Sequence, residues 1–176
     1  VDVYSFFVVG VLHLVSSAIL ALGGIYHAVF GPEKLEDTSL GSVFGYQGQD
    51  RFRVTVVLGV HLGALSVGSV LLFVRSVYAR GLYDTWASAG GDVRVIKDRA
   101  VSLTPYILGK YLVRAPFGSE GWVVSVNNME DLVGGHYWVA IGCLLGGAWH
   151  ILTKPSRAIL TTFLWSAEAY LSYSLG

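Results

Sequence analysis

Three long stretches of the chain carry no charged side chain. Asp, Glu, Lys and Arg are absent from residues 3–30, 54–74 and 132–153. Each stretch is long enough to cross the hydrocarbon core of a bilayer as a helix, which takes about 20 residues. Because backbone polar groups in lipid need partners within the segment, these spans must be helical. We predict membrane-spanning helices at 3–30, 54–79 and 132–153, and the start of a fourth from about residue 163.

Glycine and proline mark the ends of the predicted spans. Gly31-Pro32 follows the first span and Lys154-Pro155 follows the third, and both pairs are typical helix stops. The spans are joined by a polar loop at 31–53, a long loop at 80–131 and a short loop at 154–162.

The long loop combines Gly and Pro with several aromatic residues. Gly and Pro argue against one continuous helix, whereas the aromatic residues argue against disorder. We predict an ordered surface loop with short strand or helix pieces, such as 91–96 and 104–113.

Composition agrees with a membrane protein. Of 176 residues, 53% are hydrophobic and only 14% are charged, and the mean hydropathy is +0.58. The 12 basic and 12 acidic residues give no net charge, and no basic cluster indicates nucleic-acid binding. The single cysteine, Cys143, excludes a disulfide framework. The first span is too long for a signal peptide and lacks a basic leader. We predict an all-α membrane protein forming one transmembrane domain over residues 1–176, as a fragment of a longer chain.

Basic residues are unevenly placed between the loops. The short loops contain Lys34, Arg51, Arg53, Lys154 and Arg157, which favours the cytoplasmic side of the membrane for loops 31–53 and 154–162. The long loop then lies on the opposite side. Arg75 and Arg80, near the other end of the second span, weigh against this orientation.

The histidines of the first and third spans form an internal repeat. Both spans read His, thirteen other residues, then His, and both end in Gly-Gly-x-aromatic-His; the four residues are His13, His27, His136 and His150. Fourteen residues of helix rise about 21 Å and return to within about 40° of the starting face. Two such imidazoles point the same way near opposite leaflets, so each must serve a different ligand.

Imidazoles in a span are candidates for function, since ionisable groups are costly there. All five histidines, including His61 of the second span, lie in or at the edge of spans without the Asp, Glu or Cys partners of a zinc or catalytic site. Neutral imidazole is an axial ligand for a metal in a flat macrocycle. Glycines one turn before a histidine, such as Gly24 and Gly147, would let such a ring approach the backbone, although small residues also serve helix packing.

Two macrocycles fit this pattern. In a b-type haem electron-transfer protein, His13 and His27 would pair with His136 and His150. A magnesium tetrapyrrole, that is chlorophyll, needs one ligand for each ring, and the fifth histidine favours this arrangement. A transporter that uses intramembrane histidines is a third class.

Other polar and aromatic residues have simpler interpretations. Trp138 and Trp149 are predicted to pack or to lie at the membrane interface, although each neighbours a histidine and would be able to touch a bound ring. Glu168 is predicted to be a first-turn acid at a helix N-terminus after Ser166. The remaining acids are predicted to be solvated loop charges: Asp84, Asp92, Glu130 and Asp131.

Several segments resemble a known family. They include "VVGVLHLVSSAILALGGIYHAVFGPEKLED", "GLYDTWASAGGDVRVI", "APFGSEGWVVSVNNMEDLVGGHYW", "GGAWHILTKP" and "WSAEAYLSYSLG". Over nearly the whole chain, the sequence resembles the chlorophyll-binding inner antenna family of photosystem II. That family includes the smaller core antenna subunit, the iron-stress-induced chlorophyll protein and the prochlorophyte chlorophyll a/b-binding proteins. The loop "APFGSEGWVVSVNN" fits the core subunit better than the shortened version expected in the iron-stress-induced protein, whereas 34–54 and 154–162 fit the core subunit loosely.

The resemblance implies a six-helix fold of three pairs around a pseudo-threefold axis, of which this chain would carry helices two to four and the start of the fifth. It implies chlorophyll a and carotenoid as cofactors, other photosystem and antenna subunits and membrane lipid as partners, and excitation transfer without catalysis. The chain would lie in the thylakoid membrane, with loop 31–53 cytoplasmic or stromal and loop 80–131 lumenal. The implied axial magnesium ligands are His13, His27, His61, His136 and His150.

Overall fold

The computed structural model describes residues 2–32, 39, 41, 50–96 and 106–176. Most of the predicted loop 31–53, including Lys34, lies outside the described residues, as do 97–105 of the long loop. By its internal contacts the chain divides into two compact units. The first unit comprises Val1–Val3 and Gly59–Trp149, and the second comprises Tyr4–Leu58 and His150–Gly176.

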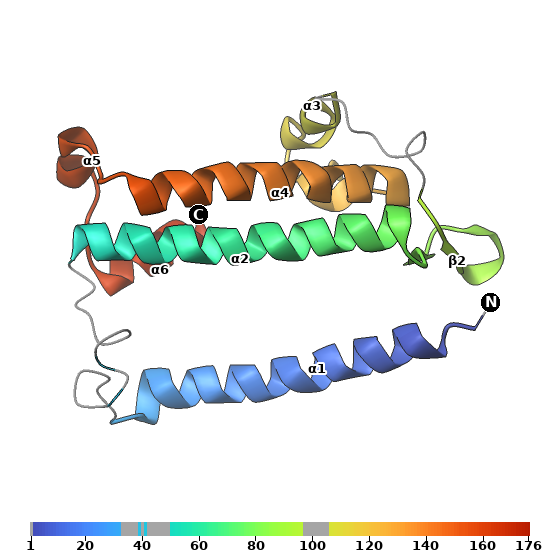
Figure 1. Ribbon diagram of the computed structural model, residues 1–176, viewed down its shortest axis with the longest axis horizontal. Coiled ribbons are helices and arrows are strands. Elements are labelled where there is room, and N and C mark those ends of the chain that lie inside the picture. The colour runs from blue at the N-terminus through green and yellow to red at the C-terminus, as the bar shows by residue number, and fades with distance from the viewer. Residues whose placement is uncertain (1, 33–38, 40, 42–49, 97–105) are drawn as a thin grey trace. The chain divides into compact units, whose positions relative to one another are not determined.

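Three long helices occupy the three predicted spans. They are α1 (Tyr4–Ile25), α2 (Arg51–Tyr78) and α4 (Met129–Leu152) (Figure 1). All three are long and apolar enough to cross a membrane, and only 0%, 11% and 22% of their most apolar windows are buried within the chain. A helix that is apolar on all sides and exposed suits a lipid environment rather than water. The structure confirms the all-α membrane class.

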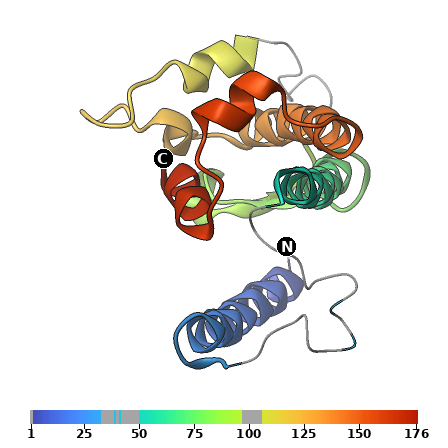
Figure 2. The same cartoon turned by 90° about the vertical axis from the view of Figure 1, so that its left-hand side faces the viewer.

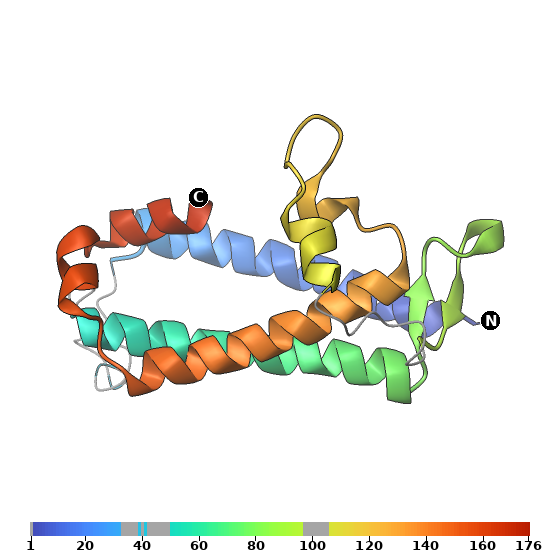
Figure 3. The same cartoon turned by 90° about the horizontal axis from the view of Figure 1, so that it is seen from above.

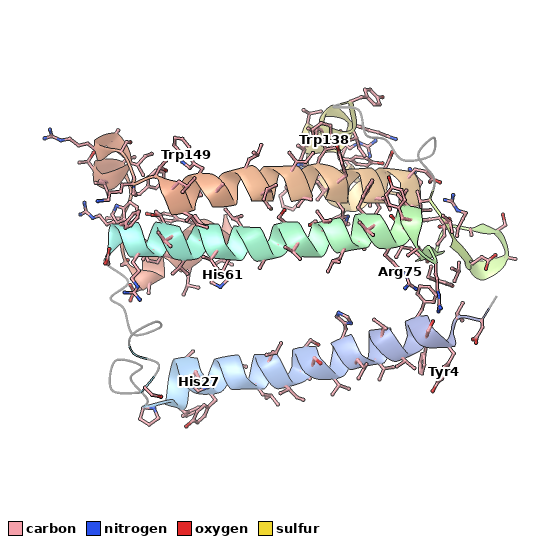
Figure 4. The ribbon with its side chains drawn as sticks, viewed as in Figure 1. Tyr4, His27, His61, Arg75, Trp138 and Trp149 are labelled. Carbon is pink, nitrogen blue, oxygen red and sulfur yellow. The ribbon has the colours of Figure 1, made fainter. Side chains whose placement is uncertain are left out.

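The first helix ends in a different geometry from the others. After Ile25 the chain continues as a π-helical turn, η1 (Tyr26–Phe30), and the helical segment stops at Gly31 as predicted from Gly31-Pro32. The wider turn contains His27, whose ring makes an edge contact with Tyr26 at 5.1 Å between centroids. Tyr4 lies at the start of α1, and His27 lies in the turn that follows its end (Figure 4). Single π turns inside helices are often found at functional positions.

Within the first unit, α2 and α4 are neighbours (Figure 1) and cross each other, as the view from above shows (Figure 3). The buried hydroxyl of Ser66 donates a hydrogen bond to the carbonyl oxygen of Ala140 across the interface at 2.7 Å. The aromatic rings of Phe73 and Tyr137 lie 5.2 Å apart nearer the loop end. Figure 2, which looks along the two helices, shows them as adjacent coils. Small residues and an interhelical hydrogen bond are typical of helix pairs in membranes.

A short antiparallel hairpin follows α2. Strands β1 (Leu82–Asp84) and β2 (Asp92–Arg94) pair with Leu82 opposite Arg94, and a 3-10 turn, η3 (Ser88–Gly90), lies between them. Gly81 joins α2 to β1 at φ +80°, and a Cβ there would lie 2.3 Å from the carbonyl oxygen of Arg94. Only glycine fits this junction, because both the φ angle and the close backbone exclude a side chain.

A small apolar core fixes the hairpin against the start of α4. Ile96, Met129 and Val133 are buried together. The backbone N–H of Ile96 donates to the carbonyl of Ser76 in α2 at 2.9 Å. This core ties the long loop to both helices of the first unit, so the loop is ordered where it is described.

Two further helical pieces complete the long loop. They are α3 (Tyr106–Leu112) and the 3-10 turn η4 (Trp122–Ser125), and both lie beside α4 in the first unit (Figure 3). The structure therefore confirms short elements in both expected places, with β2 inside 91–96 and α3 inside 104–113.

The second unit contains two short helices after α4. The predicted loop 154–162 is wrong in part, because α5 (Arg157–Thr162) forms there, with the Ser156 hydroxyl accepting from the N–H of Ile159. Helix α6 (Ala167–Leu175) begins four residues later than predicted, capped by Ser166, and Glu168 lies in its first turn as expected. Arg51 lies 5.9 Å from the Trp165 ring.

The acids predicted to be solvated loop charges are mostly paired instead. Asp84 is only 4% exposed; its carboxylate accepts from the Arg94 Nε at 3.0 Å and from the N–H of Trp86 at 2.9 Å. Arg94 also pairs with Glu130 of α4. The guanidinium group of Arg94 thus joins the hairpin to the start of α4. Asp92 is exposed, as predicted for a solvated loop charge.

Replacing Arg94 with methionine should loosen the hairpin. The variant leaves the buried Asp84 carboxylate without its cationic partner, which we expect to cost about 1–3 kcal/mol of unfolding free energy. Arg80→Met, at an exposed arginine, removes the same charge and is the matched control. Limited proteolysis between residues 80 and 96 should be faster for Arg94→Met alone; equal rates for the two variants would contradict the prediction.

Candidate functional site

The histidines that begin the two halves of the sequence repeat are held in the same way. In α1 the Nδ1 of His13 lies 2.9 Å from the carbonyl oxygen of Val9. In α4 the Nδ1 of His136 lies 2.8 Å from the carbonyl oxygen of Leu132. Each bond reaches back four residues along the helix. The repeat seen in the sequence therefore extends to the environment of the first histidine in each half.

These bonds determine which ring nitrogen is available to a ligand. A carbonyl oxygen only accepts, so Nδ1 must carry the proton and donate it. In a neutral imidazole the lone pair is then on Nε2, directed away from the helix backbone. Metal-ligating histidines in proteins commonly donate their other N–H to a backbone carbonyl in this manner. His13 and His136 thus have the tautomer and orientation of an axial ligand.

The other three histidines are also accessible or partly accessible. His27 and His61 are exposed, and His150 is half-buried near the end of α4. Figure 4 shows His61 on the side of α2 away from α4. The described residues contain no group of three or more His, Cys, Asp or Glu side chains that would hold a metal ion. In the described part of the chain, the histidines are therefore not members of a side-chain cluster that would hold a metal ion by itself.

The glycines near these histidines divide into two kinds. Gly147 faces α2, where an added Cβ would lie 2.9 Å from the Gly59 oxygen and 3.2 Å from the Gly63 nitrogen. Gly59 and Gly63, which flank His61 in sequence, therefore serve helix packing rather than space beside that histidine. By contrast, a Cβ at Gly23 or Gly24 would meet no described atom within 4 Å.

A cavity of about 530 Å³ lies between α4 and the loop elements α3 and η4. Its wall is mainly apolar and includes Leu108, Trp122 and Val139 together with His136 and Trp138. The volume is within the range of about 300–1,000 Å³ typical of pockets for small organic ligands. Figure 4 shows Trp138 on the side of α4 that faces α3. One candidate ligand residue, His136, thus borders a preformed apolar cavity.

A polar cluster that includes Asp131 and Tyr111 borders this cavity. Asp131 accepts hydrogen bonds from Lys110 at 2.7 Å, from the Tyr111 hydroxyl and from Asn128 at 3.1 Å. The bond to Asp131 raises the pKa of Lys110, and burial together with the same carboxylate raises the pKa of Tyr111. Both groups therefore keep their protons at neutral pH, and α3 stays attached to the start of α4.

The sequence matches one known family over its entire length. The model of the family described as "Photosystem II protein" aligns with residues 1–176. The chain belongs to the photosystem II protein family. Membership of this photosystem II family implies association with other photosystem subunits, and together with the three apolar helices it indicates a thylakoid membrane protein.

Two features of this photosystem II protein were missed in the sequence. Ser66 shares a face of α2 with Gly59 and Gly63, so the spacing of small residues at i, i+4 and i+7 was a readable signal for the contact with α4. The cavity beside His136 had no such signal. It depends on how α3 and η4 fold back onto α4, which residue spacing does not specify.

Proposed function

We propose that this photosystem II protein is a chlorophyll-binding antenna subunit of the smaller core antenna type. Its proposed axial ligands to chlorophyll magnesium are His13, His27, His61, His136 and His150. The observation that carries the proposal is the matched pair of Nδ1–carbonyl bonds at His13 and His136. These two histidines occupy equivalent positions of the sequence repeat, and each has its Nε2 left to bind a metal. This arrangement suits a macrocycle whose metal takes one axial ligand from the protein.

The separation of the histidines supports chlorophyll rather than haem. A b-type haem uses two histidines on one iron, whereas His61 would be left without a partner in such a scheme. His61 lies on the side of α2 away from α4, so it does not face the histidines of that helix (Figure 4). A magnesium tetrapyrrole with a single protein ligand is compatible with each histidine by itself.

In this function the protein positions pigments and performs no catalysis. The histidines fix the place of each ring, and the exposed apolar side chains of α1, α2 and α4 offer surface for ring faces, hydrocarbon tails, carotenoid and lipid. When bound, the pigments would absorb light and pass excitation towards a reaction centre. Fourteen-residue spacing would place pigments about 21 Å apart along α1 and along α4, in a layer near each leaflet.

The proposed orientation puts loop 80–131 in the lumen and loop 31–53 in the cytoplasm or stroma. The helix ends opposite the long loop support it, because cations there lie beside aromatic rings. Lys154 lies 5.3 Å from the Phe52 ring, and Arg51 lies near Trp165. Basic and aromatic side chains together are typical anchors at a membrane interface.

The absorption spectrum of the purified protein tests the pigment class. We expect a strong red chlorophyll band, whereas a reducible haem band would overturn the proposal. His150→Leu should then lose or loosen about one chlorophyll for each chain while the span still inserts, because leucine keeps the helix apolar and removes the ligand. Pigment extraction and fluorescence spectra measure the loss. Unchanged pigment content would remove His150 from the ligand set.

A further inference from the structure

Several large apolar side chains of the long loop point out of the protein. They lie in the α3–η4 segment, residues 106–125, which contains α3, the turns after it and η4. Phe117, Val124 and Val113 are 84%, 83% and 81% exposed, and Tyr106 of α3 is 74% exposed. Exposed apolar side chains gathered on one short segment indicate a surface that is covered in the working environment of the protein.

The α3–η4 segment lies beside the membrane-spanning part of α4. Leu108 and Trp122 of the segment line the same cavity as Val139 of α4. Val139 comes eight residues after Asp131, the last charged residue before the uncharged run 132–153, and therefore lies about 12 Å further along the helix. In Figures 1 and 3, α3 lies alongside α4, whereas the β1–β2 hairpin lies beyond the helix ends. The segment thus reaches the depth at which α4 enters the bilayer.

The charged side chains of the segment have partners close by. The sequence places three of them there, Lys110, Arg114 and Glu120. Because charged groups are costly to move out of water unless they are paired, such contacts make a less polar environment easier to tolerate. In the same order, the partners are the Asp131 carboxylate at 2.7 Å, the Ser125 hydroxyl at 2.7 Å and the backbone N–H of Ala115 at 3.0 Å.

The backbone of the segment limits how deep it can lie. Residues 113–121 are turns, bends and irregular backbone. Irregular backbone that faces lipid is not tolerated in the hydrocarbon core, because its polar groups find no partners there. The interfacial layers, which add about 5–8 Å on each side of a core of about 30 Å, contain headgroups and water that can bond these groups. The segment therefore suits the interfacial layer and not the core.

We propose that the α3–η4 segment lies in the interfacial layer of the bilayer beside α4, and that Val113, Phe117 and Val124 contact lipid acyl chains. Lipid is the partner because the segment continues the apolar surface of a membrane span: Val139, on the shared cavity, is itself 52% exposed. Amphipathic elements bind to membranes in this way, with their apolar side chains at the boundary of headgroups and acyl chains. Contact with lipid would hold the long loop against the membrane and fix the loop wall of the cavity beside His136. The inference is independent of the pigment that the protein binds.

Photolabelling from the lipid side tests the proposal in the intact complex. The complex is placed in nanodiscs of phosphatidylcholine that contain a fraction of phosphatidylcholine with a diazirine near the carboxyl end of one acyl chain. After irradiation, mass spectrometry of proteolytic fragments locates the lipid adducts. We expect adducts within 113–124 and none on the hairpin 82–94, which belongs to the same loop and is the internal reference. Adducts no more frequent on 113–124 than on the hairpin would overturn the proposal, because the segment would then lie in water or under another protein subunit.

A charge on the segment should remove it from the lipid. Phe117→Asp changes a side chain that is 84% exposed, so we expect the fold to stay and the adducts within 113–124 to fall to the level of the hairpin. Ser88→Asp is the matched control, because it adds the same charge at an exposed position of the hairpin and should leave the adducts unchanged. Undiminished labelling in Phe117→Asp would overturn the contact of Phe117 with acyl chains. Pigment content is measured separately, so the antenna function stands or falls on its own spectrum.

Discussion

Gly147→Ala should push α2 and α4 apart. The new methyl group would lie 2.9 Å from the Gly59 carbonyl oxygen and 3.2 Å from the Gly63 nitrogen, and both are backbone atoms of the facing helix. Backbone cannot give way as a flexible side chain can, so the helices must separate or tilt. Overpacking of this kind costs about 1–3 kcal/mol, and the same movement would weaken the Ser66–Ala140 hydrogen bond.

The neighbouring glycine provides the control for this prediction. A Cβ at Gly146 would meet only the Leu62 Cδ1, at the ordinary contact distance of 3.8 Å. Alanine has a higher helix propensity than glycine, by about 1 kcal/mol, so Gly146→Ala should be neutral or stabilising. Both variants are purified in mild-detergent micelles and unfolded by adding a denaturing detergent. The midpoint of that unfolding transition measures their stability. If Gly147→Ala were as stable as Gly146→Ala, that result would contradict the close backbone contact between α2 and α4 at Gly147.

The spans were predictable because lipid leaves few alternatives. An uncharged run of more than 20 residues must close its own backbone hydrogen bonds, and helices do so locally. Gly31-Pro32 and Lys154-Pro155 ended the helices for equally local reasons, namely the missing proline N–H and the freedom of glycine. The short elements β2 and α3 also lay where the aromatic and glycine pattern of the loop indicated them.

Features that depend on long-range contacts were not predictable in the same way. The partners Asp84 and Arg94 are ten residues apart, and Lys110 and Asp131 are twenty-one apart, so their pairing follows from the path of the loop. An acid in a loop looks solvated in the sequence unless its partner is known. Helix α5, beginning at Arg157, was missed because six residues are too few to show a helical period.

The candidate site shows the same division between local and distant information. The spacing of His13 and His136 in the repeat was visible in the sequence, and their Nδ1 bonds reach only four residues back, so helix geometry alone supplies them. By contrast, the roles of the glycines could be assigned only from the folded structure. Gly147 proved to be a packing residue, whereas Gly24, at the equivalent place of the repeat, has open space around its Cα.

His13→Leu and His136→Leu should each remove about one tetrapyrrole, and the double variant should remove about two. Under the proposed function each imidazole binds its own magnesium through Nε2, and the two losses are independent because the sites share no ligand. Leucine keeps both helices apolar and removes only the lone pair. Pigment extracted from purified complexes, counted for each chain, measures the loss, and the absorption difference spectrum of the double variant should equal the sum of the two single differences.

A bis-histidine haem gives a different result from the same three variants. If His13 and His136 were the two axial ligands of one iron, either single substitution would remove the same cofactor, and the double variant would lose no more than each single one. Leu14→Ala, an exposed position beside His13, controls for disturbance of the span and should keep every pigment. Additive loss supports one ring for each histidine, because only separate sites can be emptied one at a time; a non-additive loss would mean that the two imidazoles share a ligand.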